Sequence, residues 1–314
     1  MKKLIAVLLL AASGAALAQG YPSKTVRFVS GVTPGAASDT MARILAEKLS
    51  ATLGQPVIVE NRLGAGGLVG ARYVAQQAEP DGHTIMMYAS AFTVSTLLSP
   101  GLDPKELTPV ATVATIPTVL ITPPGKFKTH ADFVSAAKAQ GGKTVCTDAG
   151  VGSATHMALE RFRIAAGFEV TSVHTKGPGE ALTEVISGRA DCYFALIFQA
   201  QKMRDAGKVG ALLVSSPKRS SLMPDLPTTV EAGYPNSDYN FWVGALVSSK
   251  TPRAIVERLH KEINALVQSP EIDGRIKKLG ADPLTLSIAE FQAMIDRELA
   301  ENAQLIKAAG IKAN

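Results

Sequence analysis

The chain has 314 residues, of which 46% are hydrophobic and 19% are charged, and its formal net charge is +5. These apolar residues suffice for one large or two medium domains, and the composition argues against an intrinsically disordered chain. The charge is modest, and no cluster of Lys and Arg is interleaved with aromatic residues, so we expect no nucleic-acid partner.

Residues 1–18 have the pattern of a secretory signal peptide. Two lysines precede an apolar run over residues 4–10, and small residues ending at Ala18 follow. The run is too short to span a bilayer as a helix, and no cysteine directly follows Ala18 to carry a lipid anchor. We therefore expect an exported, periplasmic protein that is not embedded in the membrane.

A loop of small residues over 31–37 lies between a predicted strand and a predicted helix. Residues 24–30 are rich in Val and Phe, whereas apolar residues recur at helical spacing from Met41 until Gly54. A helix start carries unpaired N–H groups and partial positive charge, which favours an anion, and Gly35 leaves the backbone accessible. The alternative is an ordinary turn capped by Ser38 or Asp39.

Strand and helix patterns alternate along the rest of the chain. We expect strands at 57–60, 84–89, 110–113, 116–122, 143–147, 169–173, 191–195, 209–214 and 241–248, and helices that end near residues 78, 139, 166, 187, 268, 279 and 308. Such alternation predicts an α/β fold with mostly parallel sheets flanked by helices.

The alternating elements fall into two sets that a Pro-Pro-Gly cluster at 123–125 separates. We expect a first lobe of residues 20–122 and 247–314 and a second lobe of residues 123–246. A ligand would bind between the lobes, beyond the carboxyl ends of the strands, and the lobes would hinge near 122–124 and 243–248.

No catalytic or metal-binding motif is complete. No serine has glycines two residues away on both sides, and the glycine-rich stretches at 64–69 and 150–155 lack the third glycine of a dinucleotide fingerprint. The five histidines show no HExxH spacing, and the two cysteines form no CxxC motif. We expect no enzymatic activity, no cofactor and no metal; an exported enzyme is the rival class.

Several motifs are spread over the whole chain after residue 20. They include Pro34-Gly35 with Asp39, the stretch LGQPVIVENR at 53–62, GAGG at 64–67, PDGHT at 80–84 and LPT at 226–228. Together they resemble the extracytoplasmic solute receptors of tripartite tricarboxylate transporters, the Bug or TctC-like family. The resemblance implies a two-lobed type II periplasmic binding protein, expected to be a monomer, that closes on a small organic carboxylate and delivers it to integral membrane transporter subunits.

The resemblance also implies a ligand site at loops of both lobes, where backbone amides and ordered waters hold the carboxylate. For Asp39, an alternative role is to complement the helix dipole, and exposed Lys176 and helix-start His156 have structural alternatives too. The matching first-lobe positions are Thr33, Pro34, Gly35, Ala36, Ala37, Ser38, Asp39, Ser90, Ala91 and Thr93, and the second-lobe positions are Gly152, Ser153, Ala154, Thr155, His156, Thr175, Lys176 and Ala195.

Two positions depart from the family pattern. Thr175 stands where the family usually has Tyr, and Ala195 stands where it often has Asp. An Asp would repel a second carboxylate, and Thr leaves more room than Tyr. We therefore expect the ligand to be a dicarboxylate, and this class includes aromatic dicarboxylates. The alternatives are a receptor for an amino acid or another small solute, and a ligand-sensing component rather than a transport receptor.

The family's usual strand order also bears on Cys146 and Cys192. It would make the two strands that carry these residues neighbours, and export permits a disulfide. However, Cys146 falls near the end of its predicted strand and Cys192 near the start of its own. The resemblance therefore leaves a disulfide and two buried free thiols open.

Overall fold

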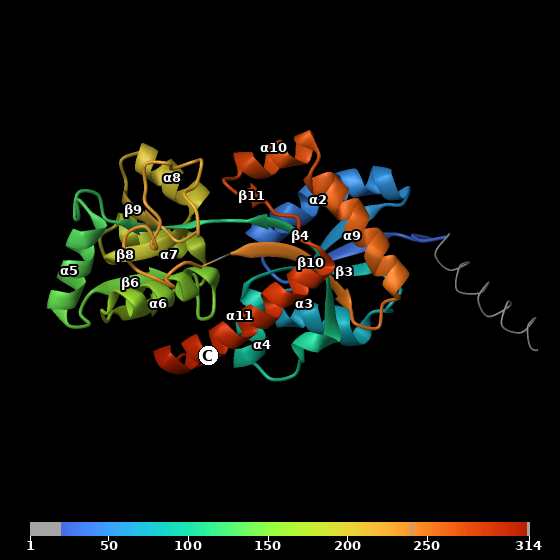
Figure 1. Cartoon of the computed structure of the whole chain (residues 1–314), viewed down its shortest axis with the longest axis horizontal. Coiled ribbons are helices and arrows are strands. Elements are labelled where there is room, and N and C mark those ends of the chain that lie inside the picture. Colours follow the sequence, from blue (N-terminus) through green and yellow to red (C-terminus); the bar gives the residue numbers. More distant parts are fainter. Residues whose placement is uncertain (1–19, 240, 313–314) are drawn as a thin grey trace, which may run out of the picture.

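Two separate β-sheets, one in each lobe, organise the computed structural model, which describes residues 20–239 and 241–312 (Figure 1). The predicted signal peptide, residues 1–18, lies outside the described residues. The strands are β1 (Val26–Ser30), β2 (Val57–Asn61), β3 (Thr84–Ala89), β4 (Leu107–Thr115), β5 (Thr118–Thr122), β6 (Val145–Asp148), β7 (Thr171–His174), β8 (Cys192–Leu196), β9 (Gly210–Val214), β10 (Trp242–Ser248) and β11 (Asp282–Pro283).

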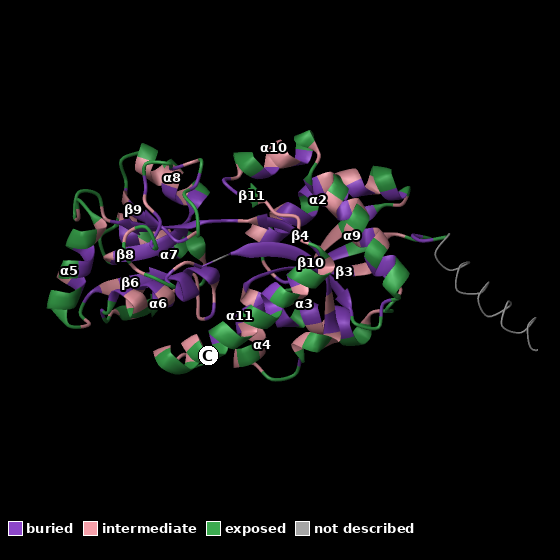
Figure 2. Ribbon diagram, viewed as in Figure 1, coloured by how far each residue is buried: buried purple, intermediate pink, exposed green. Residues whose placement is uncertain are grey.

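Helices flank both sheets. In Figure 2 the strands and the inward helix faces are buried, whereas the outward helix faces are exposed. The α-helices are α2 (Ala37–Leu53), α3 (Leu68–Arg72), α4 (Ala91–Leu98), α5 (His130–Gln140), α6 (Ala154–Ala166), α7 (Pro178–Ile186), α8 (Ile197–Asp205), α9 (Arg253–Val267), α10 (Pro270–Lys278) and α11 (Ile288–Ala309). Three short helical segments are η1 (Ala65–Gly67), η2 (Tyr73–Gln77) and η3 (Pro104–Glu106).

The first sheet has the strand order β11-β4-β10-β3-β1-β2, with β1 parallel to its neighbours β2 and β3. Alternate side chains of β1 enter different cores: Phe28 packs with Met41 of α2, whereas Val29 packs with Leu68 of α3. Both faces are covered, which explains why these strands are apolar without alternation.

The second sheet has the order β7-β6-β8-β5-β9. Strands β6, β7 and β8 run parallel, and β5 pairs antiparallel with β8 and β9. In Figure 1, α8 lies above this sheet and α6 below it. The predicted α/β class with two lobes is thus confirmed.

The predicted lobe boundaries are wrong at both crossings. Strand β5 pairs only within the second sheet, and β10 pairs with β3 and β4 of the first. The chain therefore crosses at residues 116–117 and returns just before Trp242, rather than at 122–124 and 243–248. The Pro-Pro-Gly cluster ends strand β5, and Pro117, which lacks an N–H, lies in the actual crossing.

Two helices were absent from the expected elements. Helices α4 and α8 follow β3 and β8 with at most one residue between. No Gly or Pro separates strand from helix at either place, so the short apolar runs give no turn signal. In the described part of the chain, no helix is both long and apolar enough to cross a membrane.

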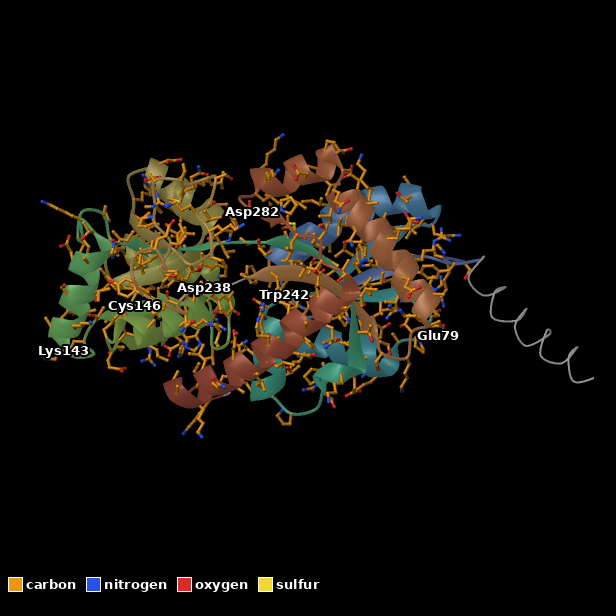
Figure 3. The ribbon with its side chains drawn as sticks, viewed as in Figure 1. Glu79, Lys143, Cys146, Asp238, Trp242 and Asp282 are labelled. Atoms are coloured by element: carbon orange, nitrogen blue, oxygen red, sulfur yellow. A yellow bond between two sulfur atoms is a disulfide. The ribbon has the colours of Figure 1, made fainter. Side chains whose placement is uncertain are left out.

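Cys146, labelled in Figure 3, forms a disulfide with Cys192 that joins β6 to β8. Strand β6 begins at Val145, so Cys146 lies near its start, as Cys192 does in β8. The two residues are direct register partners with a Cα–Cα distance of 4.6 Å. The expected mismatch of register came from placing the start of the first strand two residues too early.

The C-terminal helix α11 connects the two lobes. It packs on α4 and β4 of the first lobe and reaches α6 of the second. Buried Trp242, labelled in Figure 3, donates its Nε1–H to Glu298 over 2.8 Å, and Arg161 of α6 pairs with Glu301 over 2.9 Å. Burial raises the pKa of Glu298 to about 7, and the hydrogen bond from Trp242 only partly offsets it.

The disulfide predicts that the denatured, unreduced protein contains no titratable thiol. Because the bond joins residues 46 positions apart, its reduction should lower the free energy of unfolding by up to about 4 kcal/mol, chiefly by releasing the unfolded chain. Thiol titration and urea unfolding with and without reductant measure both quantities. Two titratable thiols in the unreduced sample would contradict the bond.

The raised pKa of Glu298 predicts that the difference in stability between the wild type and a Glu298→Gln variant depends on pH. This pKa rises from 4.5 when unfolded to about 7 when folded. The free energy of unfolding therefore falls as the pH rises from 4.5 to about 7, because the folded state must then bury a charged carboxylate. Glu298→Gln keeps an acceptor for Trp242 and should become more stable than the wild type by roughly 3 kcal/mol between pH 4.5 and 8.

Urea unfolding at several pH values measures this difference. The exposed carboxylate of Asp296 lies on the same helix, so Asp296→Asn provides a matched control with an expected flat profile. A Glu298→Gln effect of the same size at pH 5 and pH 8 would show that the carboxylate does not titrate in this interval.

Candidate ligand-binding site

In the loop between β1 and α2, residues 33–35 are exposed to solvent. The N-cap residue of α2 is Ala36, whose side chain makes no capping hydrogen bond. Neither Ser38 nor Asp39 is therefore the N-cap residue, although Asp39 does accept one backbone N–H at this turn. An Asp39 carboxylate oxygen accepts the N–H of Gly35 over 2.8 Å, and the first N–H groups of α2 lack a side-chain acceptor.

Asp39 holds this loop in one arrangement. Its side chain is only 1% exposed and accepts hydrogen bonds from Arg43 at 2.9 and 3.0 Å and from Asn61 at 2.8 Å. Asn61 also donates to the carbonyl of Val32 over 2.9 Å. Burial alone would raise the pKa of Asp39, but the hydrogen bonds from Arg43, Gly35 and Asn61 outweigh it and lower that pKa. Asp39 therefore orders the loop.

Ser90 and Thr93 join the start of α4 to the interlobe crossing. The N–H of Ser90 donates to the carbonyl of Trp242 over 3.0 Å, and Tyr239 donates its hydroxyl to the Ser90 Oγ over 3.2 Å. Thr93 donates to the Ser90 carbonyl and accepts from Asn302 of α11, both over 2.8 Å. Both side chains are fully buried and bonded within the protein.

At the start of α6, the second-lobe side chains also bond internally. Ser153 is the N-cap, and its Oγ accepts the N–H of His156 over 3.2 Å. Thr155 Oγ1 accepts the N–H of Ala149 over 2.9 Å. The Nδ1 atom of buried His156 accepts the N–H of Gly152 over 3.0 Å. Burial lowers the pKa of His156 to about 4, so its ring is neutral at pH 7.

Asp148 plays a role in the second lobe that the sequence did not reveal. It ends β6, and its carboxylate accepts the N–H of Gly150 and contacts His174 Nδ1, each at 2.8 Å. Its carbonyl accepts both the N–H and the hydroxyl of Thr175, at 3.1 and 2.7 Å. Asp148 and His174 are register partners at the ends of β6 and β7, a relation that only the strand pairing shows.

Two cavities adjoin the second lobe. One, of about 380 Å³, is lined by His156, Glu160 and His174 and by the end of α11. The other, of about 730 Å³, lies between α6, the segment 235–239 and α11, and includes Asp238, labelled in Figure 3. Neither cavity is lined by residues 33–39. The cavity that His156 lines is therefore not the one that the first-lobe loop would border.

The lobes touch beside the predicted site. A Cβ atom added at Gly152 would lie 3.0 Å from Val94 of α4, so the second-lobe loop packs against the first lobe there. Ala195, expected to face the ligand, is fully buried in β8 within the core. Among the predicted residues, Thr33, Pro34, Gly35 and Lys176 are exposed; Ala36, Ala37, Ala91, Ser153 and Thr175 are half-buried; and Ser38, Asp39, Ser90, Thr93, Gly152, Ala154, Thr155, His156 and Ala195 are buried.

Similar proteins of known structure share this two-lobed arrangement. A protein of R. palustris solved with adipate has a TM-score of 0.83 and 28% sequence identity, covering 93% of this chain and 99% of that one. MatC from Rhodopseudomonas palustris with bound malate has a TM-score of 0.79 and 27% identity, covering 91% of this chain and all of that one (100%).

Sequence comparison gives the same relationship. Protein BugT of Bordetella pertussis is 29% identical over 323 aligned residues, which cover 99% of each chain. The family model described as the tripartite tricarboxylate transporter family receptor, TctC, matches residues 41–311. This is a family of solute-binding receptors rather than enzymes, which confirms the expected absence of catalysis. The chain belongs to the TctC family of tripartite tricarboxylate transporter receptors, together with its Bug-type relatives.

Proposed function

We propose that this protein is a periplasmic receptor that captures a small organic carboxylate between its lobes and delivers it to a tripartite tricarboxylate-type membrane transporter. The observation that carries the proposal is the start of α2. This helix of 17 residues begins without a side-chain cap, directly behind exposed residues 33–35. Its unpaired N–H groups and the positive end of its dipole favour a carboxylate.

A dicarboxylate, aromatic ones included, is the ligand class we propose. Adipate and malate, with which two similar proteins were solved, are both dicarboxylates. In the second lobe, Ser153 and Thr175 carry half-buried hydroxyls, and Lys176 is an exposed cation. Ala195 does not bear on the ligand class, because its side chain is buried in the core. A receptor for an amino acid or another solute, and a ligand-sensing component, remain the alternatives.

Ligand screening tests the receptor function directly. Thermal-shift measurements with mono-, di- and tricarboxylates, aromatic acids and amino acids should show the largest shift with a dicarboxylate. A ligand at 100 times its Kd stabilises the folded state by roughly 2.7 kcal/mol. Small-angle scattering with the best ligand should show a smaller radius of gyration if the sample starts open, because the lobes close.

Two results would argue against this function. Tight binding of an amino acid together with no response to carboxylates would overturn the ligand class. Turnover of a bound candidate, followed by chromatography, would instead indicate an enzyme.

Replacing Gly35 tests the first-lobe loop. Gly35 has φ +84° and a Cβ there meets no atom within 4 Å, so Gly35→Val strains the backbone and puts a branched side chain on the exposed loop. We expect carboxylate affinity to fall at least tenfold, about 1.4 kcal/mol, by calorimetry. Gly54→Val is the matched control, because Gly54 has φ +69° and equally open space at the other end of α2.

The control separates strain from ligand contact. Both variants should lose similar stability, on the order of 1–2 kcal/mol, but only Gly35→Val should lose affinity. Unchanged affinity in a folded Gly35→Val protein would remove this loop from the site.

A further inference from the structure

We propose that Asp148, His156 and His174 form a binding site for a divalent transition-metal ion such as Zn²⁺. One potential ligand atom of each residue lies within 4.8 Å of those of the other two. Over residues 20–239 and 241–312, this is the one group of at least three His, Cys, Asp or Glu residues that brings its potential ligand atoms this close together. The proposal concerns a site apart from the first-lobe loop at residues 33–39, and it does not depend on the proposed receptor function.

Three elements of the second lobe bring these side chains together. Asp148 and His174 are register partners at the ends of the parallel strands β6 and β7, with 2.8 Å between Oδ2 and Nδ1. His156 lies in the first turn of α6, which follows β6 after a short loop. The two imidazole rings have centroids 4.9 Å apart at an angle of 74°.

The donor set suits a borderline transition metal. Two imidazoles and one carboxylate are common ligands of Zn²⁺, whereas Mg²⁺ and Ca²⁺ prefer oxygen ligands. Ligand atoms about 2.1 Å from a tetrahedral ion are separated by about 3.4 Å. The three ligand atoms here are up to 4.8 Å apart. To bind the ion, the side chains must therefore move inward by roughly 1 Å. A fourth position can face the cavity of about 380 Å³ that both histidines line, which has room for water.

The ion would replace two existing hydrogen bonds. It would lie between Asp148 Oδ2 and His174 Nδ1, and the proton that these atoms share would leave to solvent. The Nδ1 lone pair of His156, which now accepts the N–H of Gly152, would bind the ion instead. The freed Gly152 N–H would need a water molecule or a metal-bound oxygen as acceptor. Ligands must be deprotonated, so affinity should rise with pH.

The surrounding charges permit a cation. The cation Arg163 lines the same cavity, but its guanidinium pairs with Glu160 at 2.6 Å and with Glu169 at 3.0 Å. The carboxylates of Asp148, Glu160 and Glu169 carry three negative charges. The cations that line the cavity, Arg163 and Lys312, carry two positive charges. A divalent cation therefore enters a site where carboxylates outnumber basic side chains.

Titration of the metal-free mature protein with Zn²⁺ tests the proposal, using protein without a histidine tag. Calorimetry should show one ion per chain, with no comparable binding of Mg²⁺ or Ca²⁺. The Co²⁺ form should show visible d–d bands typical of four or five ligands. His174→Ala should weaken Zn²⁺ binding at least tenfold and remove these bands, and Asp148→Asn should weaken binding similarly.

His174→Ala is the more informative variant, because its side chain is 35% exposed and fully buried Asp148 also holds the neighbouring loops. His130→Ala, which removes a half-buried histidine of α5, is the matched control and should bind Zn²⁺ as the wild type does. The proposal is overturned if the wild type shows no saturable Zn²⁺ binding, or if folded His174→Ala binds as tightly as His130→Ala. Either result would leave Asp148 and His174 as a hydrogen-bonded pair only.

Discussion

A buried carboxylate that satisfies the donors of neighbouring loops is the interaction on which the predicted site depends. Asp39 is enclosed almost completely, yet Gly35, Arg43 and Asn61 all donate to it. Burying an ionised carboxylate costs several kcal/mol unless such donors compensate it. Because these donors come from the loop, from α2 and from β2, the carboxylate is satisfied only when all three segments are in place. The exposed loop residues 33–35 are therefore held in one conformation.

The second lobe uses Asp148 in a similar way but with different chemistry. Asp148 binds the loop before α6 and the end of β7 through Gly150, His174 and Thr175. Asp39 is paired with an arginine, a permanent cation that cannot coordinate a metal. Asp148 is paired with an imidazole, which is both a hydrogen-bond partner and a metal ligand. In the part of the chain that the structure describes, the group of potential metal ligands therefore surrounds Asp148 and not Asp39.

Helix α11 links the lobes through interactions of unequal strength. The bonds from Trp242 to Glu298 and from Asn302 to Thr93 are buried and join parts of the first lobe. The pair of Arg161 with Glu301 spans the two lobes, and Glu301 is 45% exposed. A pair with one partner so exposed contributes about 1 kcal/mol or less. If the lobes close on a ligand as proposed, helix α11 is expected to move with the first lobe, because its link to α6 is the weaker one.

The family and the α/β class followed from the sequence because they depend on local patterns. Helix α2 starts beyond a small-residue loop and ends at Gly54, as its apolar spacing and the glycine predict. The strand–helix alternation likewise predicted two sheets. What the local pattern could not decide was lobe membership: β5 and β10 are apolar strands that fit either sheet, and only hydrogen-bond pairing assigns them.

The sequence by itself thus determined most of the elements, their order and the family, since each depends on neighbouring residues; it missed α4 and α8, where no Gly or Pro marks the change from strand to helix. Only the tertiary structure decided that Cys146 pairs with Cys192, that Ala195 is buried and that Asp148 meets His156 and His174. Each of these facts depends on the register between segments far apart in the chain. A shift of one residue in a strand turns its side chains to the opposite face, so no local pattern can determine which side chains meet.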